Sequence, residues 1–119
     1  MGIEMLRAAL DKSLINSLVT QYWRVSVVDV TGSTQTDLAE SVHSNSAIDG
    51  EVLIANYQSA GRGRMDREFI AAPSSALLFS LYKKVKRPRA EWNFLAILTA
   101  LSIAEALTSI DANQVIKVK

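Results

Sequence analysis

The segment Val25-Ser26-Val27-Val28-Asp29-Val30 leads directly into Thr31-Gly32-Ser33-Thr34-Gln35-Thr36-Asp37, and the change between the two sets the architecture of the chain. A run rich in β-branched valines is typical of a mostly buried strand. Thr34 with Asp37 three residues later resembles a capping box, which begins a helix. The sequence therefore predicts a buried strand followed at once by a helix from Gln35 to about Val42.

The other elements are predicted from the same kinds of pattern. Leucines at positions 6, 10, 14 and 18 recur at helical spacing, so a helix precedes the first strand. Further strands are predicted at 51–57, 76–82 and 115–118, and a long helix at about 90–110. This order mixes crossover helices with an antiparallel pair. We therefore expect one α+β domain over residues 1–119, with a mixed β-sheet and helices packed on one face.

Composition narrows the possible functions. The 119 residues can bury one core, and a net charge of +1 gives no sign of nucleic-acid binding. The chain has no cysteine and a single histidine, His43, so disulfides, thiolate nucleophiles and Cys- or His-rich metal sites are excluded. No signal peptide is predicted, because charged residues interrupt the N-terminal leucines. The apolar stretch from Trp92 to Leu107 is interrupted by polar residues, and we expect a buried helix rather than a membrane span.

The loop Tyr57-Gln58-Ser59-Ala60-Gly61-Arg62-Gly63-Arg64 has the composition of an anion-binding segment. Glycine allows backbone N–H groups to converge on an anion, and each guanidinium can grip a phosphate or carboxylate through two hydrogen bonds. A flexible basic loop, or one that contacts a nucleic-acid backbone, is the alternative. The basic run at 83–89 is more simply explained as a solvated turn, because no aromatic residues are interleaved with its charges.

Together these segments resemble the catalytic domain of biotin protein ligases. In that family a Gly-Ser-Thr-Asn turn, a Gln-x-Ala-Gly-Arg-Gly-Arg loop and a Lys-Trp-Pro-Asn-Asp segment surround one pocket. The first two are nearly complete here, and the third stops after its lysine, Lys119. Gln35 stands where the family usually has asparagine, and Phe69 where it usually has tryptophan. The chain resembles about the first half of the catalytic region, whose fold is similar to that of class II aminoacyl-tRNA synthetases.

The resemblance also implies roles for particular residues. It implies that Ser33, Thr34 and Gln58 bind the ureido ring of biotin. It implies that the biotin carboxylate and its adenylate are bound by Gly61, Arg62, Arg64 and Lys119, and that two of these, Arg64 and Lys119, act in catalysis. The nucleotide would be bound by Arg64, Arg67 and Phe69. Mg²⁺ would complete the charge balance, but no metal ligand is identified, since Asp66 and Glu68 could equally pair with neighbouring arginines.

The implied activity is ATP-dependent formation of biotinyl-5′-AMP, followed by transfer of biotin to a lysine of a biotin carboxyl carrier protein domain. The resemblance further implies a cytoplasmic enzyme that does not contact a membrane, and possible homodimers of the full-length protein. One short helix before the first strand leaves no room for a DNA-binding module, so DNA is not an expected partner. The chain as it stands is expected to be inactive. A lipoate ligase is the nearest alternative, and a noncatalytic anion- or nucleic-acid-binding module is the other.

Overall fold

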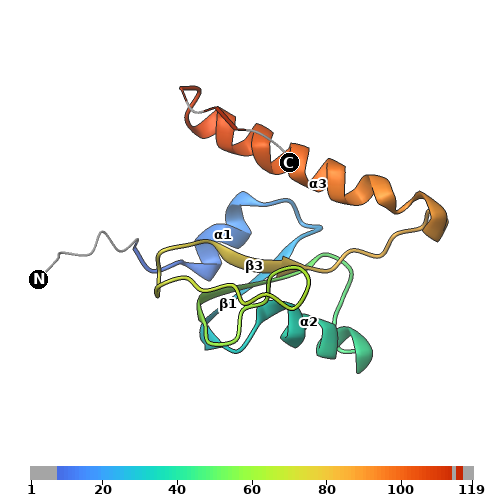
Figure 1. The fold of residues 1–119 in the computed structure, drawn as a ribbon, viewed down its shortest axis with the longest axis horizontal. Coiled ribbons are helices and arrows are strands. Elements are labelled where there is room, and N and C mark those ends of the chain that lie inside the picture. Colours follow the sequence, from blue (N-terminus) through green and yellow to red (C-terminus); the bar gives the residue numbers. More distant parts are fainter. Residues whose placement is uncertain (1–7, 114, 117–119) are drawn as a thin grey trace, which may run out of the picture. The chain divides into compact units, whose positions relative to one another are not determined.

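A computed structural model describes residues 8–113 and 115–116 (Figure 1). The chain divides into two compact units, with the boundary between Lys84 and Val85, and each unit is described by itself. The first unit holds a three-stranded sheet in the order β1-β2-β3. The strands are β1 (Arg24–Thr31), β2 (Glu51–Gln58) and β3 (Leu78–Leu81).

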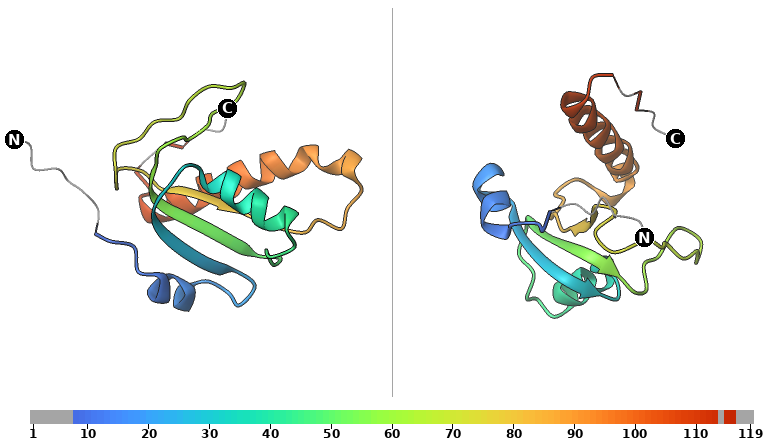
Figure 2. Two further views of the ribbon diagram at one scale, coloured as in Figure 1. Left: turned by 90° about the horizontal axis from the view of Figure 1, so that it is seen from below. Right: turned by 90° about the vertical axis from the view of Figure 1, so that its left-hand side faces the viewer.

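The sheet is mixed, as the sequence predicts. β1 and β2 run parallel with Val28 opposite Ala55, whereas β2 and β3 run antiparallel with Ala55 opposite Leu78. Helix α2 (Thr34–His43) makes the crossover between the parallel strands and packs against β2 and β3 (Figure 2). Among the described residues, the buried apolar side chains come from these elements: Val25, Leu38, Ile54, Ala55 and Leu78. The core therefore lies between the sheet and the elements packed on it, and it is centred on the middle of β2.

Helix α1 (Lys12–Leu18) is attached to the edge strand β1 by a side chain. Asp11 caps the helix, accepting hydrogen bonds from the backbone N–H groups of Ser13 and Leu14. Asn16 then accepts from the Val25 N–H and donates to the Val25 carbonyl, both at 2.9 Å. The amide thus satisfies two backbone groups that a neighbouring strand would otherwise satisfy, which protects the edge of the sheet.

A polar cluster closes the end of the sheet at which β2 begins. The Tyr22 hydroxyl donates to Asp49 Oδ1 at 2.5 Å, and the Lys84 N–H donates to the same oxygen at 2.7 Å. These two hydrogen bonds hold the pKa of Asp49 below its ordinary value, while the bond to Asp49 and partial desolvation raise the pKa of Tyr22. The next residue is Gly50, with φ +93°, where a Cβ would lie 2.1 Å from the Tyr22 carbonyl oxygen. Only glycine fits this turn.

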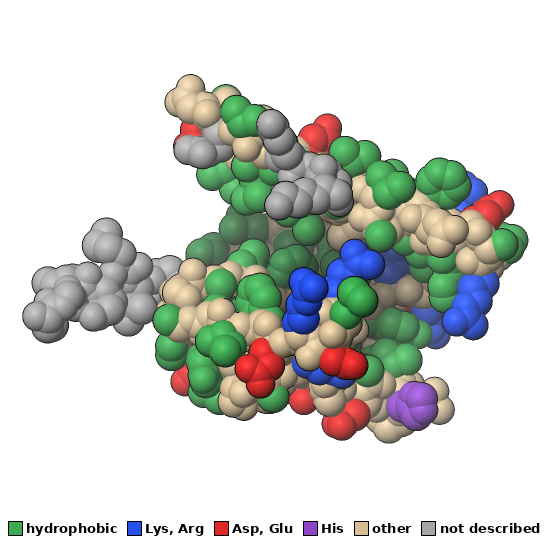
Figure 3. Space-filling view, viewed as in Figure 1, with side chains coloured by type: hydrophobic (Ala, Val, Ile, Leu, Met, Phe, Trp, Pro, Cys, Tyr) green, Lys and Arg blue, Asp and Glu red, His purple; other side chains and the backbone are tan. Residues whose placement is uncertain are grey.

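The second unit contains a short 3₁₀ helix, η1 (Arg89–Glu91), and the long helix α3 (Asn93–Ile110). None of the described residues of α3 is buried, which contradicts the prediction of a buried helix. Hydrophobic side chains are exposed along it (Figure 3). A helix that is apolar on most sides is normally buried against other elements, and the rest of this unit, as far as the structure describes it, does not bury it.

Two further predictions for this unit concern the suitability of α3 as a membrane span and the strand expected at 115–118. By length and composition alone, with a mean hydropathy of 1.6, α3 reaches what a membrane span requires, as the core helix of a soluble protein also can. The expectation that this stretch falls short of a span is therefore wrong. The predicted strand at 115–118 is not seen at Val115 and Ile116, and its last two residues lie outside the described part of the chain.

Candidate ligand-binding site

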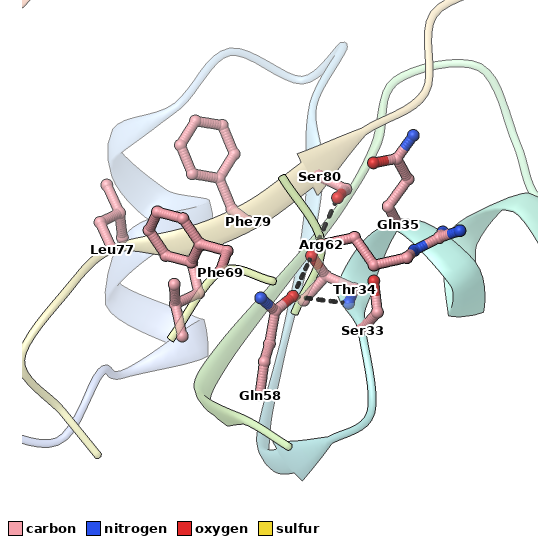
Figure 4. Close-up of a pocket in the computed structure, with 10 residues that line it drawn as sticks. Ser33, Thr34, Gln35, Gln58, Arg62, Phe69, Leu77, Phe79 and Ser80 are labelled. Carbon is pink, nitrogen blue, oxygen red and sulfur yellow. Dashed lines mark hydrogen bonds between the residues drawn. The ribbon is translucent and has the colours of Figure 1, made fainter. Parts of the chain in front are cut away.

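A hollow of about 200 Å³ lies where the parallel strands end and α2 begins (Figure 4). The carboxyl ends of parallel strands are the usual place for ligands in such sheets, because the following loops diverge there. One wall is polar and comes from the start of α2 and the end of β2, and the other is apolar and comes mainly from β3. The lining residues are Ser33, Thr34, Gln35, Gln58, Arg62, Phe69, Leu77, Leu78, Phe79 and Ser80.

The start of α2 is fixed by Ser33. Its side chain is the N-cap and accepts a hydrogen bond from the Thr36 N–H at 3.4 Å, so the helix begins at Thr34, one residue earlier than predicted. Asp37 does not complete the predicted capping box, because its carboxylate accepts a hydrogen bond from the Thr31 hydroxyl. Ser33 is 5% exposed and Thr34 is 2% exposed. Burial of two hydroxyl side chains requires partners inside the protein.

Thr34 finds those partners on two other elements. Its backbone N–H and its hydroxyl both donate to Gln58 Oε1, at 2.8 Å and 3.0 Å. Its Oγ1 also lies 2.9 Å from the Oγ of Ser80 on β3. These contacts join the helix start to β2 and β3, and they turn the amide nitrogen of Gln58 away from Thr34 (Figure 4).

The arginine loop folds back as a small hairpin. The Phe69 N–H donates to the Gly61 carbonyl at 2.8 Å, and the Gly63 N–H donates to the Arg67 carbonyl at 2.6 Å. The turn is made by Met65 and Asp66, with φ of 58° and 61°, angles that few non-glycine residues adopt. Because the Gly63 N–H is used within the hairpin, it does not contribute to the anion-binding concavity that the sequence suggested.

Gly61 is required for close packing. A Cβ at this position would lie 2.5 Å from the Phe69 carbonyl oxygen and 2.9 Å from Gln58 Nε2. Both distances are shorter than van der Waals contact permits, so a side chain would push the hairpin away from Gln58. Gly61 therefore brings the arginine loop against the polar wall of the hollow.

The arginines differ in where they lie. Arg62 lines the hollow and donates to the Thr36 hydroxyl at 2.8 Å. Arg67 lines a second hollow of about 430 Å³, which shares Gln58, Arg62 and Phe69 with the first. Arg64 lines neither of these two hollows. Within the described residues the one ion pair joins Arg87 and Glu91, at 3.3 Å.

The loop guanidiniums are therefore not neutralised by a carboxylate of the described chain. Asp66 and Glu68 line the second hollow but form no ion pair with any arginine that the structure describes, so they are not the salt-bridge partners that the sequence allowed. Unpaired guanidiniums beside a hollow attract anionic groups, phosphates and carboxylates above all. The site joins a small polar and apolar hollow to a larger one whose walls carry both arginines and carboxylates.

Residues 27–119 match the sequence profile described as the biotin/lipoate A/B protein ligase family. The chain belongs to this family. A curated relative, named as a biotin–[acetyl-CoA-carboxylase] ligase from Mycobacterium tuberculosis, is 35% identical in an alignment of 114 residues, and the match covers 92% of this chain. The same match covers 43% of the relative, so the chain spans less than half of that protein's length.

The structure brings most of the predicted site residues of this ligase family together. The first hollow gathers Ser33, Thr34, Gln58, Arg62 and Phe69, and the second adds Gly61 and Arg67. Lys119 lies outside the described residues. The roles assigned to all of these residues, including Arg64, stay predictions.

Sequence reasoning missed the apolar wall formed by Leu77, Leu78 and Phe79, and it missed two hydrogen-bonding residues of the site. Ser80 contacts Thr34, and Thr36 accepts a hydrogen bond from Arg62. A signal for Ser80 was present, because it is the one hydroxyl residue in the otherwise apolar strand Leu78–Leu81. Thr36 had no signal beyond its place in the first turn of a helix.

Mg²⁺ is expected from the sequence, but the sequence identifies no residues that would bind it. Across residues 8–113 and 115–116, no group of three or more His, Cys, Asp or Glu side chains is placed to hold a metal ion. Mg²⁺ is often held by one or two carboxylates together with substrate phosphates, and Asp66 and Glu68 in the second hollow could serve in that way.

Proposed function

We propose that this chain carries the biotin and ATP sites of a biotin protein ligase, which forms biotinyl-5′-AMP and passes the biotinyl group to a lysine of a carrier protein domain. The observation that carries the proposal is the polar wall of buried Thr34 and its partner Gln58, beside loop guanidiniums that have no carboxylate partner among the described residues. Such a wall can form hydrogen bonds to a small polar ring, and the guanidiniums can bind the biotin carboxylate and the ATP phosphate that react with each other.

The polar wall favours biotin over lipoate, a distinction that the family match leaves open. Biotin carries a ureido group, whereas lipoate carries a dithiolane ring that forms only weak hydrogen bonds. With lipoate in the hollow, the Gln58 amide and the Ser33 hydroxyl would lose water without gaining partners. Each buried polar group left in that state costs about 1–3 kcal/mol. A site of this kind rejects the ligand that lacks the polar group.

The arginines that line the two hollows would act in the chemical step. A carboxylate oxygen of biotin forms a bond to the α-phosphorus of ATP, and the bond to pyrophosphate breaks. Two anions must approach each other, so the protein has mainly to neutralise charge and hold the reactants in line. Arg62 and Arg67 line the hollows in which this would occur. Mg²⁺, arriving with ATP, would supply further neutralisation of the phosphates.

The second step needs a reactive amine from the partner. The ε-amino group of a carrier lysine attacks the carbonyl carbon of biotinyl-AMP, the bond to the phosphate oxygen breaks, and AMP leaves with the electron pair. The amine loses a proton in forming the amide. No nucleophile of the chain is required, which agrees with a sequence that has no cysteine.

Titration calorimetry of the chain with biotin and with lipoate tests the proposal. We expect heat of binding with biotin and affinity for lipoate lower by roughly tenfold or more. Ser17→Ala, which removes an exposed hydroxyl on α1, is the control and should leave both affinities unchanged. Equal affinity for the two acids would contradict the assignment to biotin, and no binding of biotin would contradict the proposed function.

A further inference from the structure

The Thr34–Ser80 contact joins two hydroxyl groups, and the direction of its hydrogen bond follows from the neighbouring bonds. The Thr34 N–H lies 2.8 Å from one atom of the Gln58 amide, and this atom must be the oxygen because an N–H needs an acceptor. The same oxygen lies 3.0 Å from Thr34 Oγ1. A carbonyl oxygen cannot donate, so the single hydroxyl proton of Thr34 is committed to Gln58.

Ser80 must then donate to Thr34. The two hydroxyl oxygens are 2.9 Å apart, and only one of them still has a proton available. If the Ser80 proton pointed elsewhere, two oxygen lone pairs would face each other at hydrogen-bond distance. The chain of bonds therefore runs from Ser80 to Thr34 to Gln58. This order leaves the Ser80 oxygen with lone pairs only.

The bonds give the hollow a defined polarity. Ser80 lines it, and among the described residues its oxygen has Thr34 as its hydrogen-bond partner. Gln58 turns its NH₂ away from Thr34 (Figure 4), and the Ser33 oxygen already accepts a bond, so both side chains can donate into the hollow. The polar wall thus offers donors at Gln58 and Ser33 and an acceptor at Ser80.

We propose that Ser80 is a specificity-determining residue that accepts a hydrogen bond from an N–H of the ligand. Its complement is a ligand group with a carbonyl oxygen next to an N–H, as in a cyclic urea. The inference rests on the proposed function, since it identifies the N–H as one of the two on the ureido ring of biotin. It adds a polar contact from β3, which otherwise supplies the apolar wall, to the hydrogen-bonding groups of α2, β2 and the arginine loop.

The test compares biotin with its two cyclic carbamate analogues, in each of which one ring N–H is replaced by oxygen. The shape hardly changes, but a donor becomes an acceptor facing the Ser80 lone pairs. Calorimetry on the 119-residue chain should show that one carbamate binds at least roughly tenfold more weakly than biotin. Ser80→Ala should remove most of that ratio, because no acceptor remains to be repelled.

Ser80→Thr is the matched variant, since it keeps the hydroxyl on the same strand and should keep the ratio even if its methyl group lowers both affinities. Thermal unfolding followed by circular dichroism confirms that the variants are folded. An unchanged ratio in Ser80→Ala, equal loss of the ratio in both variants, or no discrimination by the unsubstituted chain would overturn the role of Ser80 alone. No binding of biotin by the unsubstituted chain would overturn the proposed function and this role with it.

Discussion

Thr34→Val should destabilise the first unit, because it removes a buried hydroxyl without changing the shape of the side chain. Thr34 is 2% exposed, and its hydroxyl makes two hydrogen bonds, of 3.0 Å to Gln58 and 2.9 Å to Ser80. Both partners stay in place and lose a bond. At about 1 kcal/mol for each bond, the free energy of unfolding should fall by about 2 kcal/mol, a change of roughly 30-fold in the folding equilibrium.

The assay is urea unfolding followed by far-ultraviolet circular dichroism, with the slope of free energy against urea compared between variants. Thr36→Val is the matched control, since it makes the same exchange two residues later in α2. The Thr36 hydroxyl accepts only an exposed hydrogen bond from Arg62, so its loss should cost less than about 0.5 kcal/mol. If the two variants unfold at the same urea concentration, the network around Thr34 does not contribute as argued.

Three other expectations follow from the site and the sheet. Gly61→Ala should lower biotin affinity by roughly tenfold or more because its Cβ would lie 2.5 Å from the Phe69 carbonyl oxygen, whereas Gly63→Ala, whose nearest contact is 3.4 Å, should change it little in the same titration. The urea concentration at the unfolding midpoint should fall below about pH 4. The pKa of Asp49 is lower in the folded chain than in the unfolded chain, so its carboxylate stabilises the fold above the ordinary carboxyl pKa, and this stability is lost as the pH falls through the pKa of the folded state. Tyr22→Phe should make the midpoint less dependent on pH, because it removes one hydrogen bond to that carboxylate. In a ligase extended to the length of the curated relative, Arg64→Gly should speed dissociation of biotinyl-AMP more than that of biotin, and a larger effect on biotin would contradict the role given to Arg64.

Much of the fold could be predicted because it depends on local pattern. The valine-rich run becomes β1, and the polar turn after it becomes the start of α2. The boundary was misplaced by one residue because Ser33 and Thr34 are both able to cap a helix, and their neighbours in the folded chain decide between them. Thr34 is held by Gln58 and Ser80, 24 and 46 residues away, so Ser33 is left to cap.

The features that could not be predicted depend on contacts between residues far apart in the sequence, or on surfaces that would have to pack against α3. The pairing of β2 with β3 brings Ser80 to the start of α2, and nothing local to Ser80 indicates that register. The burial of α3 would depend on surfaces beyond its own unit, which no helical periodicity specifies. We also expect a bound adenylate to order residues 59 to about 72, whose turn at Met65 and Asp66 has φ angles that few non-glycine residues adopt.

The directions of the hydrogen bonds specify the ligand groups that the site can bind more closely than its residue types do. Serine, threonine and glutamine can each donate or accept, so a wall containing all three is compatible with many ligands when only the sequence is considered. The backbone N–H of Thr34 removes that freedom, because it can only donate and therefore fixes which end of Gln58 faces it. Each later bond then has one allowed direction, and the last residue, Ser80, is left as an acceptor. One backbone group at the start of α2 thus determines which ligand groups the hollow can accept, and that dependence is what the comparison of biotin with its carbamate analogues measures.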